Sequence, residues 1–329
     1  MPSQIRAVAV DYDGTIATDG KPDPLALDAV AGARARGLRV VLVTGRILSE
    51  LKAVFPDALE RFDSVVAENG AVLAADGRER SLAPSVDTAL DEVLARRGIP
   101  FRRGLAIIAL ASGVDDHAAF VAIADCGLDC QLVRNRGELM VLPAGISKAT
   151  GLVHALAELE ISRHNTVAVG DAENDLSMLD ACALGVAVGN AVPALKQHAD
   201  LVLSERNGSG VASLLTGPLT DGKPPIRSHR RQVSLGCDEE GRWVGIDSSG
   251  IDLLIVGGSG SGKSFAAGLL AEQLVRLCYT ICVIDPERRE KLMMRTLHAL
   301  ATERKAARSA GLWRALSLWL KGRAAPARR

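Results

Sequence analysis

Residues 5–15 read IRAVAVDYDGT, and this stretch decides the fold. The run 5–10 is almost wholly apolar, which predicts a buried strand. Two aspartates, Asp11 and Asp13, follow it directly, and Gly14 then allows a tight turn. Polar residues at the end of an apolar strand are typical of open parallel sheets, where ligands bind beyond the carboxyl ends of the strands. The segment therefore predicts the first strand of an α/β domain with a site at its end.

The residues after this strand alternate between helix and strand patterns, which predicts a doubly wound parallel sheet covered on both faces. Asn69-Gly70 predicts a hairpin between two of the strands. The expected helices are 24–36, 47–55, 148–158 and 174–182, and the expected strands are 38–43, 64–67, 71–74, 166–169 and 185–188.

The stretch 77–142 breaks this alternation. It predicts helices at 86–97 and 115–126 and strands at 105–110, 130–134 and 138–142. Consecutive strands favour an antiparallel sheet, so we expect an inserted α+β module. The expected domains are a core at 1–76 and 143–216, the insert at 77–142, a Gly/Pro-rich linker at 217–232 and a further segment at 233–329.

Four polar motifs follow or flank the predicted core strands. The first motif is DYDGT at 11–15. Its Asp11 carboxylate can attack phosphorus, while the Asp13 carboxylate donates or accepts a proton. Thr44 in Thr-Gly-Arg and the ammonium group of Lys148 can hold phosphoryl oxygens. The last motif, GDAENDL at 170–176, offers oxygen ligands suited to magnesium. Convergent polar groups of this kind predict a phosphoryl-transfer site.

This series of motifs resembles the signature of the haloacid dehalogenase superfamily, over about residues 4–215. The insert resembles the type IIB cap of the Cof-like sugar phosphatases, and the segments ENGA at 68–71 and GISK at 145–148 match that subgroup. Members include archaeal-type phosphoglycolate phosphatases, sucrose-phosphate phosphatases and mannosyl-phosphoglycerate phosphatases. The resemblance implies a magnesium-dependent phosphatase that acts on a small phosphomonoester through an aspartyl-phosphate intermediate.

The resemblance also implies roles for single residues. Asp11 would be the nucleophile and a metal ligand, and Asp13 the acid/base, binding metal through its carbonyl. Thr44 and Lys148 would complete the catalytic set by holding the phosphoryl group. Asp171 and Asp175 would bind magnesium. The further phosphate- or substrate-binding residues are Gly14, Thr15, Gly45, Arg46, Asn69 and Asn174.

A second motif, GGSGSGKS at 257–264, matches the phosphate-binding P-loop pattern between an expected strand (251–256) and helix (263–277). The nucleotide-binding residues would be Gly257, Gly260, Gly262, Lys263 and Ser264, with ATP as the ligand. The segment 281–287 resembles a strand of HerA/FtsK-like motor ATPases. Too few residues follow it for a full motor domain, so we expect a partial P-loop segment.

The composition limits the cellular location and the binding partners that we expect. The net charge is zero, which indicates no polyanionic partner for the whole chain, although basic residues predominate at 288–329. That tail could contact nucleic acid or a membrane surface. The scattered cysteines favour free thiols, and neither a signal peptide nor an 18-residue apolar run is present. We expect a cytoplasmic protein.

Two other functional classes remain open from the sequence. A phosphomannomutase-like phosphotransferase would share the nucleophile and the cap, but would pass the phosphoryl group to a sugar. An ATP-binding regulator or DNA-associated ATPase would use the P-loop instead.

Overall fold

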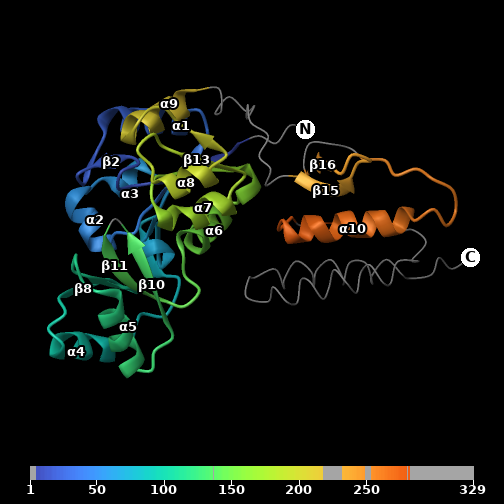
Figure 1. Ribbon diagram of the computed structural model, residues 1–329. Coiled ribbons are helices and arrows are strands. Elements are labelled where there is room, and N and C mark those ends of the chain that lie inside the picture. Colours follow the sequence, from blue (N-terminus) through green and yellow to red (C-terminus); the bar gives the residue numbers. More distant parts are fainter. Residues whose placement is uncertain (1–4, 136, 218–231, 249–252, 280, 282–329) are drawn as a thin grey trace, which may run out of the picture. The chain divides into compact units, whose positions relative to one another are not determined.

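The structure is a computed structural model that describes residues 5–135, 137–217, 232–248, 253–279 and 281. The chain divides into two compact units, Met1–Arg230 and Arg231–Arg329. The first unit contains the large sheet and the inserted module, and the second contains a short hairpin and a helix (Figure 1). All residues of the four polar motifs lie in the first unit.

Within the described residues, a sheet of eight strands forms the centre of the first unit, in the order β14-β13-β12-β1-β4-β5-β6-β7. Strands β14 to β5 run parallel, and β6 and β7 continue the sheet antiparallel. Every residue of β1 and β12 is buried, so both faces of the sheet are covered. The strands are β1 (Ala7–Asp11), β4 (Arg39–Val43), β5 (Ser64–Ala67), β6 (Val72–Ala75), β7 (Arg78–Ser81), β12 (Thr166–Gly170), β13 (Leu184–Ala187) and β14 (Leu201–Val202).

The helices around this sheet begin at local capping signals. Asp23 accepts the backbone N–H of Leu25 at the start of α1, and Ser147 forms a capping box with Thr150 at the start of α6. α1 packs on α9, and α6 packs on α7 (Figure 1). The helices are α1 (Pro24–Ala35), α2 (Leu48–Val54), α3 (Ala58–Arg61), α6 (Lys148–Glu158), α7 (Leu176–Ala181), α8 (Pro193–His198) and α9 (Asn207–Thr216).

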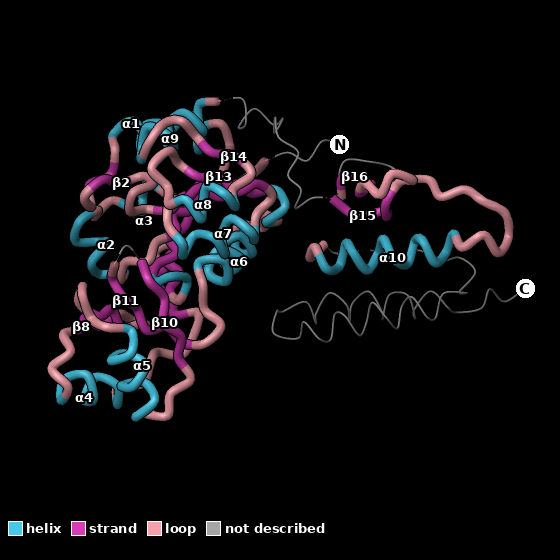
Figure 2. Tube along the Cα trace, in the orientation of Figure 1, coloured by secondary structure: helices cyan, strands magenta, loops and turns pink. Residues whose placement is uncertain are grey.

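The inserted module, called the cap below, lies between β7 and α6. Its four strands form an antiparallel sheet in the order β10-β11-β9-β8, next to α4 and α5 (Figure 2). Alternate residues of β11 face opposite ways: Leu139 and Val141 join the core of the cap, while Met140 and Leu142 join the core of the main sheet. The elements are α4 (Ala89–Arg96), β8 (Phe101–Arg103), β9 (Ile108–Leu110), α5 (Asp116–Asp125), β10 (Cys130–Asn135) and β11 (Glu138–Pro143).

The α/β class, the hairpin at Asn69-Gly70 and helix 148–158 are confirmed. Several details differ from expectation, among them the unexpected strand β8 and a helix α4 that begins at Ala89 instead of residue 86. Residues 78–81, expected in the insert, extend the main sheet as β7. The strand expected at 105–110 begins only at Ile108, because the N–H groups of residues 105–107 bond to the Glu68 carboxylate instead. The helix expected at 174–182 starts with a 3₁₀ turn, η3 (Glu173–Asp175).

The second unit contains a hairpin of β15 (Gln232–Cys237) and β16 (Trp243–Asp247), together with α10 (Lys263–Arg276). The Gln273 side chain bonds to both backbone groups of Ser234, at 2.8 and 2.7 Å, and so joins α10 to β15. The helix expected at 263–277 is confirmed, because α10 spans Lys263–Arg276.

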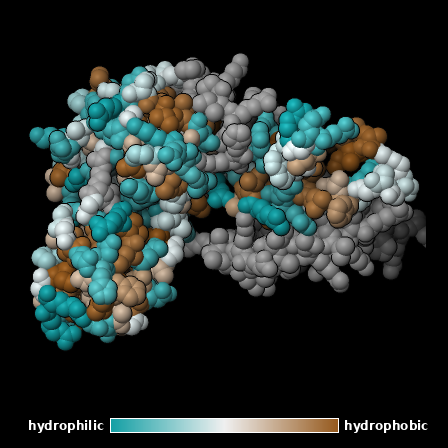
Figure 3. Space-filling model, viewed as in Figure 1, coloured by the Kyte–Doolittle hydropathy of each residue, from teal (hydrophilic) through white to brown (hydrophobic). Residues whose placement is uncertain are grey.

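The strand expected at 251–256 is wrong over its described part, because residues 253–256 have no secondary structure. No described strand takes up their backbone hydrogen bonds, and Leu254 and Val256 are 84% and 81% exposed. Hydrophobic side chains are visible on the surface of this unit (Figure 3). Residues 251–252 and 282–287 lie outside the described part of the chain. No helix among the described residues is long and apolar enough to span a membrane.

Candidate active site

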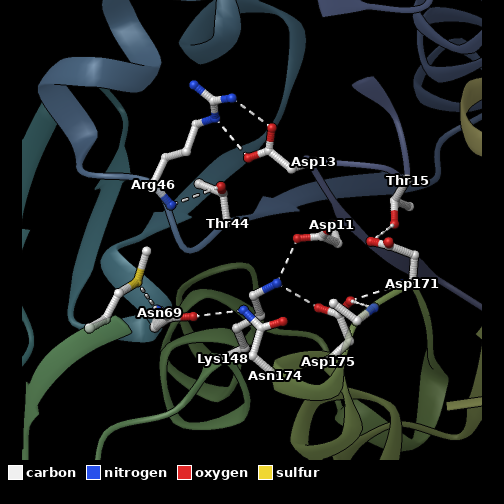
Figure 4. Close-up of polar contacts among 12 residues, drawn as sticks. Asp11, Asp13, Thr15, Thr44, Arg46, Asn69, Lys148, Asp171, Asn174 and Asp175 are labelled. Carbon is white, nitrogen blue, oxygen red and sulfur yellow. Dashed lines mark hydrogen bonds and ion pairs between the residues drawn. The ribbon is translucent and has the colours of Figure 1, made fainter. Parts of the chain in front are cut away.

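The four motifs meet at the carboxyl edge of the parallel sheet (Figure 4). Asp11 is the last residue of β1, which lies between β4 and β12. Thr44 directly follows β4, and Asp171 directly follows β12. Because parallel strands end at the same edge, these three buried side chains converge from distant parts of the sequence.

Lys148 enters this group from the first turn of α6. Its Nζ lies 2.6 Å from Asp11 Oδ1 and 2.6 Å from Asp175 Oδ1, and its side chain is 1% exposed. Burial alone would lower the pKa of Lys148, but the two carboxylates outweigh burial and raise it. The ammonium group is therefore a fixed positive charge between two aspartates.

Two glycines allow α6 to come this close. A Cβ on Gly70 would lie 1.9 Å from the Ser147 carbonyl oxygen, and one on Gly151 would lie 2.5 Å from the Gly70 Cα. Gly70 also has a φ of +102°, which disfavours a larger side chain. Close backbone contact at these two positions sets where Lys148 stands.

Asp11, Asp171 and Asp175 form a buried carboxylate cluster whose ligand oxygens all lie within 4.8 Å of one another. Asp175 is held by the backbone N–H groups of Asp171 and Ala172, at 2.9 and 3.0 Å. Burial is the main cause that raises the pKa of Asp11 well above its ordinary value, and the Asp175 charge adds to it. Three close, all-oxygen donors with excess negative charge suit a hard divalent cation such as Mg²⁺.

The small residues of the motifs line the same edge. Thr44 Oγ1 accepts the backbone N–H of Arg46 at 3.1 Å, which leaves its hydroxyl proton able to donate. The Thr15 hydroxyl donates to Asp171 Oδ1 at 3.2 Å. Asn190, which sequence reasoning missed, donates to the Gly14 carbonyl at 2.7 Å and so holds the turn after β1. Gly45 lies in the backbone between Thr44 and Arg46.

Arg46, which the resemblance implies as a phosphate- or substrate-binding residue, contacts Asp13 through its guanidinium. Two N–H groups donate to the two carboxylate oxygens at 2.7 Å each, which raises the pKa of Arg46 (Figure 4). Its Cζ also lies 5.3 Å from the centre of the Tyr12 ring. Burial raises the pKa of the Tyr12 hydroxyl to about 12. Asp13, the acid/base candidate, is therefore paired with the positively charged guanidinium group of Arg46.

Asn69 and Asn174 lie between the cap and the carboxylate cluster. Asn174 Nδ2 donates to Asn69 Oδ1 at 3.0 Å, and Asn69 Nδ2 donates to the sulfur of Met140 at 2.7 Å (Figure 4). Asn69 has a left-handed φ of +54°, which asparagine tolerates better than most residues. The two amides thus connect β11 of the cap to the motif after β12.

A cavity of about 270 Å³ lies next to Asp13, between the core and the cap. Glu50 of α2 and five cap residues belong to its wall, and sequence reasoning missed all of them. No local motif marks these positions, since they come together only when the cap packs on the core. The cap residues are Arg102, Ala109, Ser112, Glu138 and Met140.

The expected nucleotide-binding residues lie in the second unit. Gly260 and Gly262 have φ values of +76° and +86°, and α10 begins directly after them at Lys263. Lys263 Nζ lies 2.8 and 2.6 Å from the carbonyl oxygens of Gly257 and Gly258. Ser264 lies in the first turn of α10. The helix start agrees with the motif, whereas the preceding strand is missing from the described residues.

Comparisons with known proteins match the first unit to a family and to curated relatives. The family model for haloacid dehalogenase-like hydrolases matches residues 8–88 and 131–215. A phosphoglycolate phosphatase from Methanothermobacter thermautotrophicus is 34% identical over 217 residues, covering 63% of this chain and 96% of the relative. Another, from Methanothrix thermoacetophila, is 31% identical over 217 residues, covering 64% and 96%.

The fold comparison agrees with these sequence matches. The structure of a haloacid dehalogenase-like hydrolase from Bacillus subtilis superposes with a TM-score of 0.54 at 22% identity, covering 64% of this chain and 98% of that one. The regions that the family model matches, 8–88 and 131–215, include all four motifs. The chain therefore belongs to the haloacid dehalogenase-like hydrolases, and its enzyme class is that of the phosphoric monoester hydrolases.

Proposed function

We propose that this enzyme hydrolyses a small phosphomonoester through an aspartyl-phosphate intermediate on Asp11, with Mg²⁺ as cofactor. One observation carries the proposal: Asp11 lies at a strand end, 2.6 Å from the Lys148 ammonium and within 4.8 Å of the ligand oxygens of Asp171 and Asp175. A nucleophile surrounded by a fixed cation and metal-ligating oxygens is suited to a dianionic phosphate.

The chemistry takes two displacements. In the first, an Asp11 oxygen attacks phosphorus and the bond to the leaving-group oxygen breaks, while Asp13 gives that oxygen a proton. In the second, Asp13 takes a proton from water, whose oxygen attacks the same phosphorus and releases phosphate and the Asp11 carboxylate. Thr44 and Lys148 hold the phosphoryl oxygens throughout. Asp13 would have to leave its contact with Arg46 to reach the leaving group.

The metal proposal rests on the chemistry of the donors. Asp11 and Asp171 would hold Mg²⁺ through carboxylate oxygens, Asp13 through its backbone carbonyl, and Asp175 as a further ligand. When bound, the ion supplies positive charge that offsets the crowded carboxylates and the incoming phosphate. Burial raises the pKa of Asp11, and the neighbouring Asp175 charge raises it further.

The substrate class follows from the relatives and from the cavity. The curated relatives above are named phosphoglycolate phosphatases, and a cavity of about 270 Å³ admits a leaving group of a few carbon atoms. The alternative is transfer of the phosphoryl group to a sugar, as in phosphomannomutases. Product analysis with a sugar bisphosphate separates the two, because hydrolysis releases inorganic phosphate and transfer does not.

The central test is Asp11→Asn, which keeps the size of the side chain but removes the attacking oxygen anion. We expect hydrolysis of para-nitrophenyl phosphate to fall by at least about a thousandfold, with an unchanged circular dichroism spectrum. Near wild-type hydrolysis by a folded variant would exclude Asp11 as the nucleophile.

We also propose that residues 257–264 bind a nucleotide phosphate, because two left-handed glycines lead directly into α10 at Lys263. Binding of labelled ATP that disappears in Lys263→Ala would support this, and equal binding by both proteins would exclude it. We propose separately that the protein works in the cytoplasm, a reducing compartment, since none of the described cysteines forms a disulfide.

A further inference from the structure

The wall of the cavity beside Asp13 has more carboxylate groups than guanidinium groups. We propose that an ion triad of Glu50, Arg102 and Glu138 makes this leaving-group site select neutral, hydroxyl-bearing alcohols over carboxylates. The inference rests on the proposed phosphatase function and deepens it, by assigning three residues to specificity. It also sets this chain apart from relatives whose names refer to an acidic leaving group, glycolate.

The triad joins the core to the cap. Arg102, on β8, lies between Glu50 on α2 of the core and Glu138 on β11 of the cap. Its Nη1 is 3.2 Å from Glu50, and its Nη2 is 2.9 Å from both carboxylate oxygens of Glu138. One guanidinium thus serves two carboxylates, and the triad carries one net negative charge.

The rest of the cavity wall does not reverse this sign. Among the described residues that line it, the other charged groups are Asp13 and Arg46, which pair with each other through two 2.7 Å contacts. The wall therefore holds three carboxylates and two guanidinium groups, and both guanidinium groups already have carboxylate partners. A substrate carboxylate would have to displace one of these partners and would face a net negative wall.

A hydroxyl group fits the same wall better. Hydroxyl groups donate hydrogen bonds, and the ionised carboxylates of Glu50 and Glu138 accept several each. The hydroxyl of Ser112, on the same wall, can donate or accept. Lys148 would bind the phosphate end of the substrate, together with the metal that Asp11, Asp171 and Asp175 would hold, so binding of the phosphate does not depend on the charge of this wall.

The test uses substrates that differ in one group. 2-Phosphoglycolate and 2-hydroxyethyl phosphate share a two-carbon leaving group that ends in a carboxylate or a hydroxyl. 3-Phosphoglycerate and glycerol 3-phosphate repeat the comparison with three carbons. With the full-length enzyme and magnesium, we expect kcat/KM to be about tenfold higher for the hydroxyl member of each pair, a modest factor because the triad is partly exposed to solvent.

Single variants then locate the effect. Glu138→Gln and Glu50→Gln each remove one negative charge, and each should move the ratio toward the carboxylate substrate by about threefold or more. Arg102→Met should move it the other way. Glu92→Gln is the matched control, because it removes the same charge from an exposed position on α4 of the cap, outside the cavity lining. Its ratio should equal that of the wild type.

The outcomes separate the two proposals. If no phosphomonoester, para-nitrophenyl phosphate included, is hydrolysed in an Asp11-dependent way, the proposed function itself fails. If the enzyme is an Asp11-dependent phosphatase but cleaves 2-phosphoglycolate as well as or better than 2-hydroxyethyl phosphate, only the charge inference is overturned. The comparison of substrates on the wild type needs no variant to fold. A shift in the ratio for Glu92→Gln equal to that for Glu138→Gln would also overturn it.

Discussion

Replacing Lys148 with methionine tests the charge balance at the centre of the site. Methionine fills nearly the same space, so the change removes the ammonium group with little effect on packing. In the wild type, Nζ lies 2.6 Å from both Asp11 and Asp175, and all three side chains are at most 5% exposed. The variant leaves three clustered carboxylates, Asp171 included, without this cation.

The expected cost follows from that burial. Removing one partner of a buried ion pair typically costs about 3–5 kcal/mol, because a buried charge is left uncompensated. Protons can partly replace the lysine. The folded-state pKa of Asp11 is already raised, and losing Lys148 raises it further. A group with a raised folded pKa loses stability as pH rises through that pKa, so the cost should be smaller near pH 5 than near pH 8, by up to about 1.4 kcal/mol per pH unit.

The assay is urea unfolding followed by far-ultraviolet circular dichroism, in EDTA so that no divalent cation replaces the lost charge. Tryptophan fluorescence would not report on the first unit, because Trp243, Trp313 and Trp319 all lie beyond residue 217. Lys52→Met is the control, since its partner is Glu79 and both side chains are more than a third exposed. It should cost no more than about 1 kcal/mol. A loss below about 1 kcal/mol for Lys148→Met, or an equal loss at both pH values, would refute the reasoning.

Three further predictions follow from the same structure. EDTA should abolish hydrolysis, and added magnesium should restore it in the wild type but should not give Asp171→Ala activity. Magnesium should also raise the melting temperature less near pH 5 than near pH 8, because protons compete with the metal at Asp11, whose pKa is raised. Gly70→Ala should cost about 2–4 kcal/mol in urea unfolding, since its Cβ would meet the Ser147 carbonyl, whereas Gly77→Ala, with open space around it, should cost about 1 kcal/mol. Deleting residues 217–329 should leave para-nitrophenyl phosphate hydrolysis unchanged, and a folded but inactive 1–216 protein would contradict this.

Local patterns were sufficient for much of the core. The run at 5–10 predicted β1, and the stretch 148–158 predicted α6 from its first residue, because the side-chain patterns of strands and helices depend on near neighbours. The pattern was less informative where a distant group competes for the backbone. Glu68 takes the N–H groups of residues 105–107 and delays β9, and no local signal marks that contact.

The sequence by itself determined the polar residues at three strand ends, because those motifs are contiguous with β1, β4 and β12, whereas Lys148 comes from the first turn of α6. Only the tertiary structure decided how they are paired. It placed Lys148 between Asp11 and Asp175, and it paired Arg46 with Asp13. It also joined Glu50 to Arg102 across 52 residues of sequence, between the core and the cap. Long-range contacts of this kind depend on the packing of whole elements, and periodicity along the chain carries no information about them.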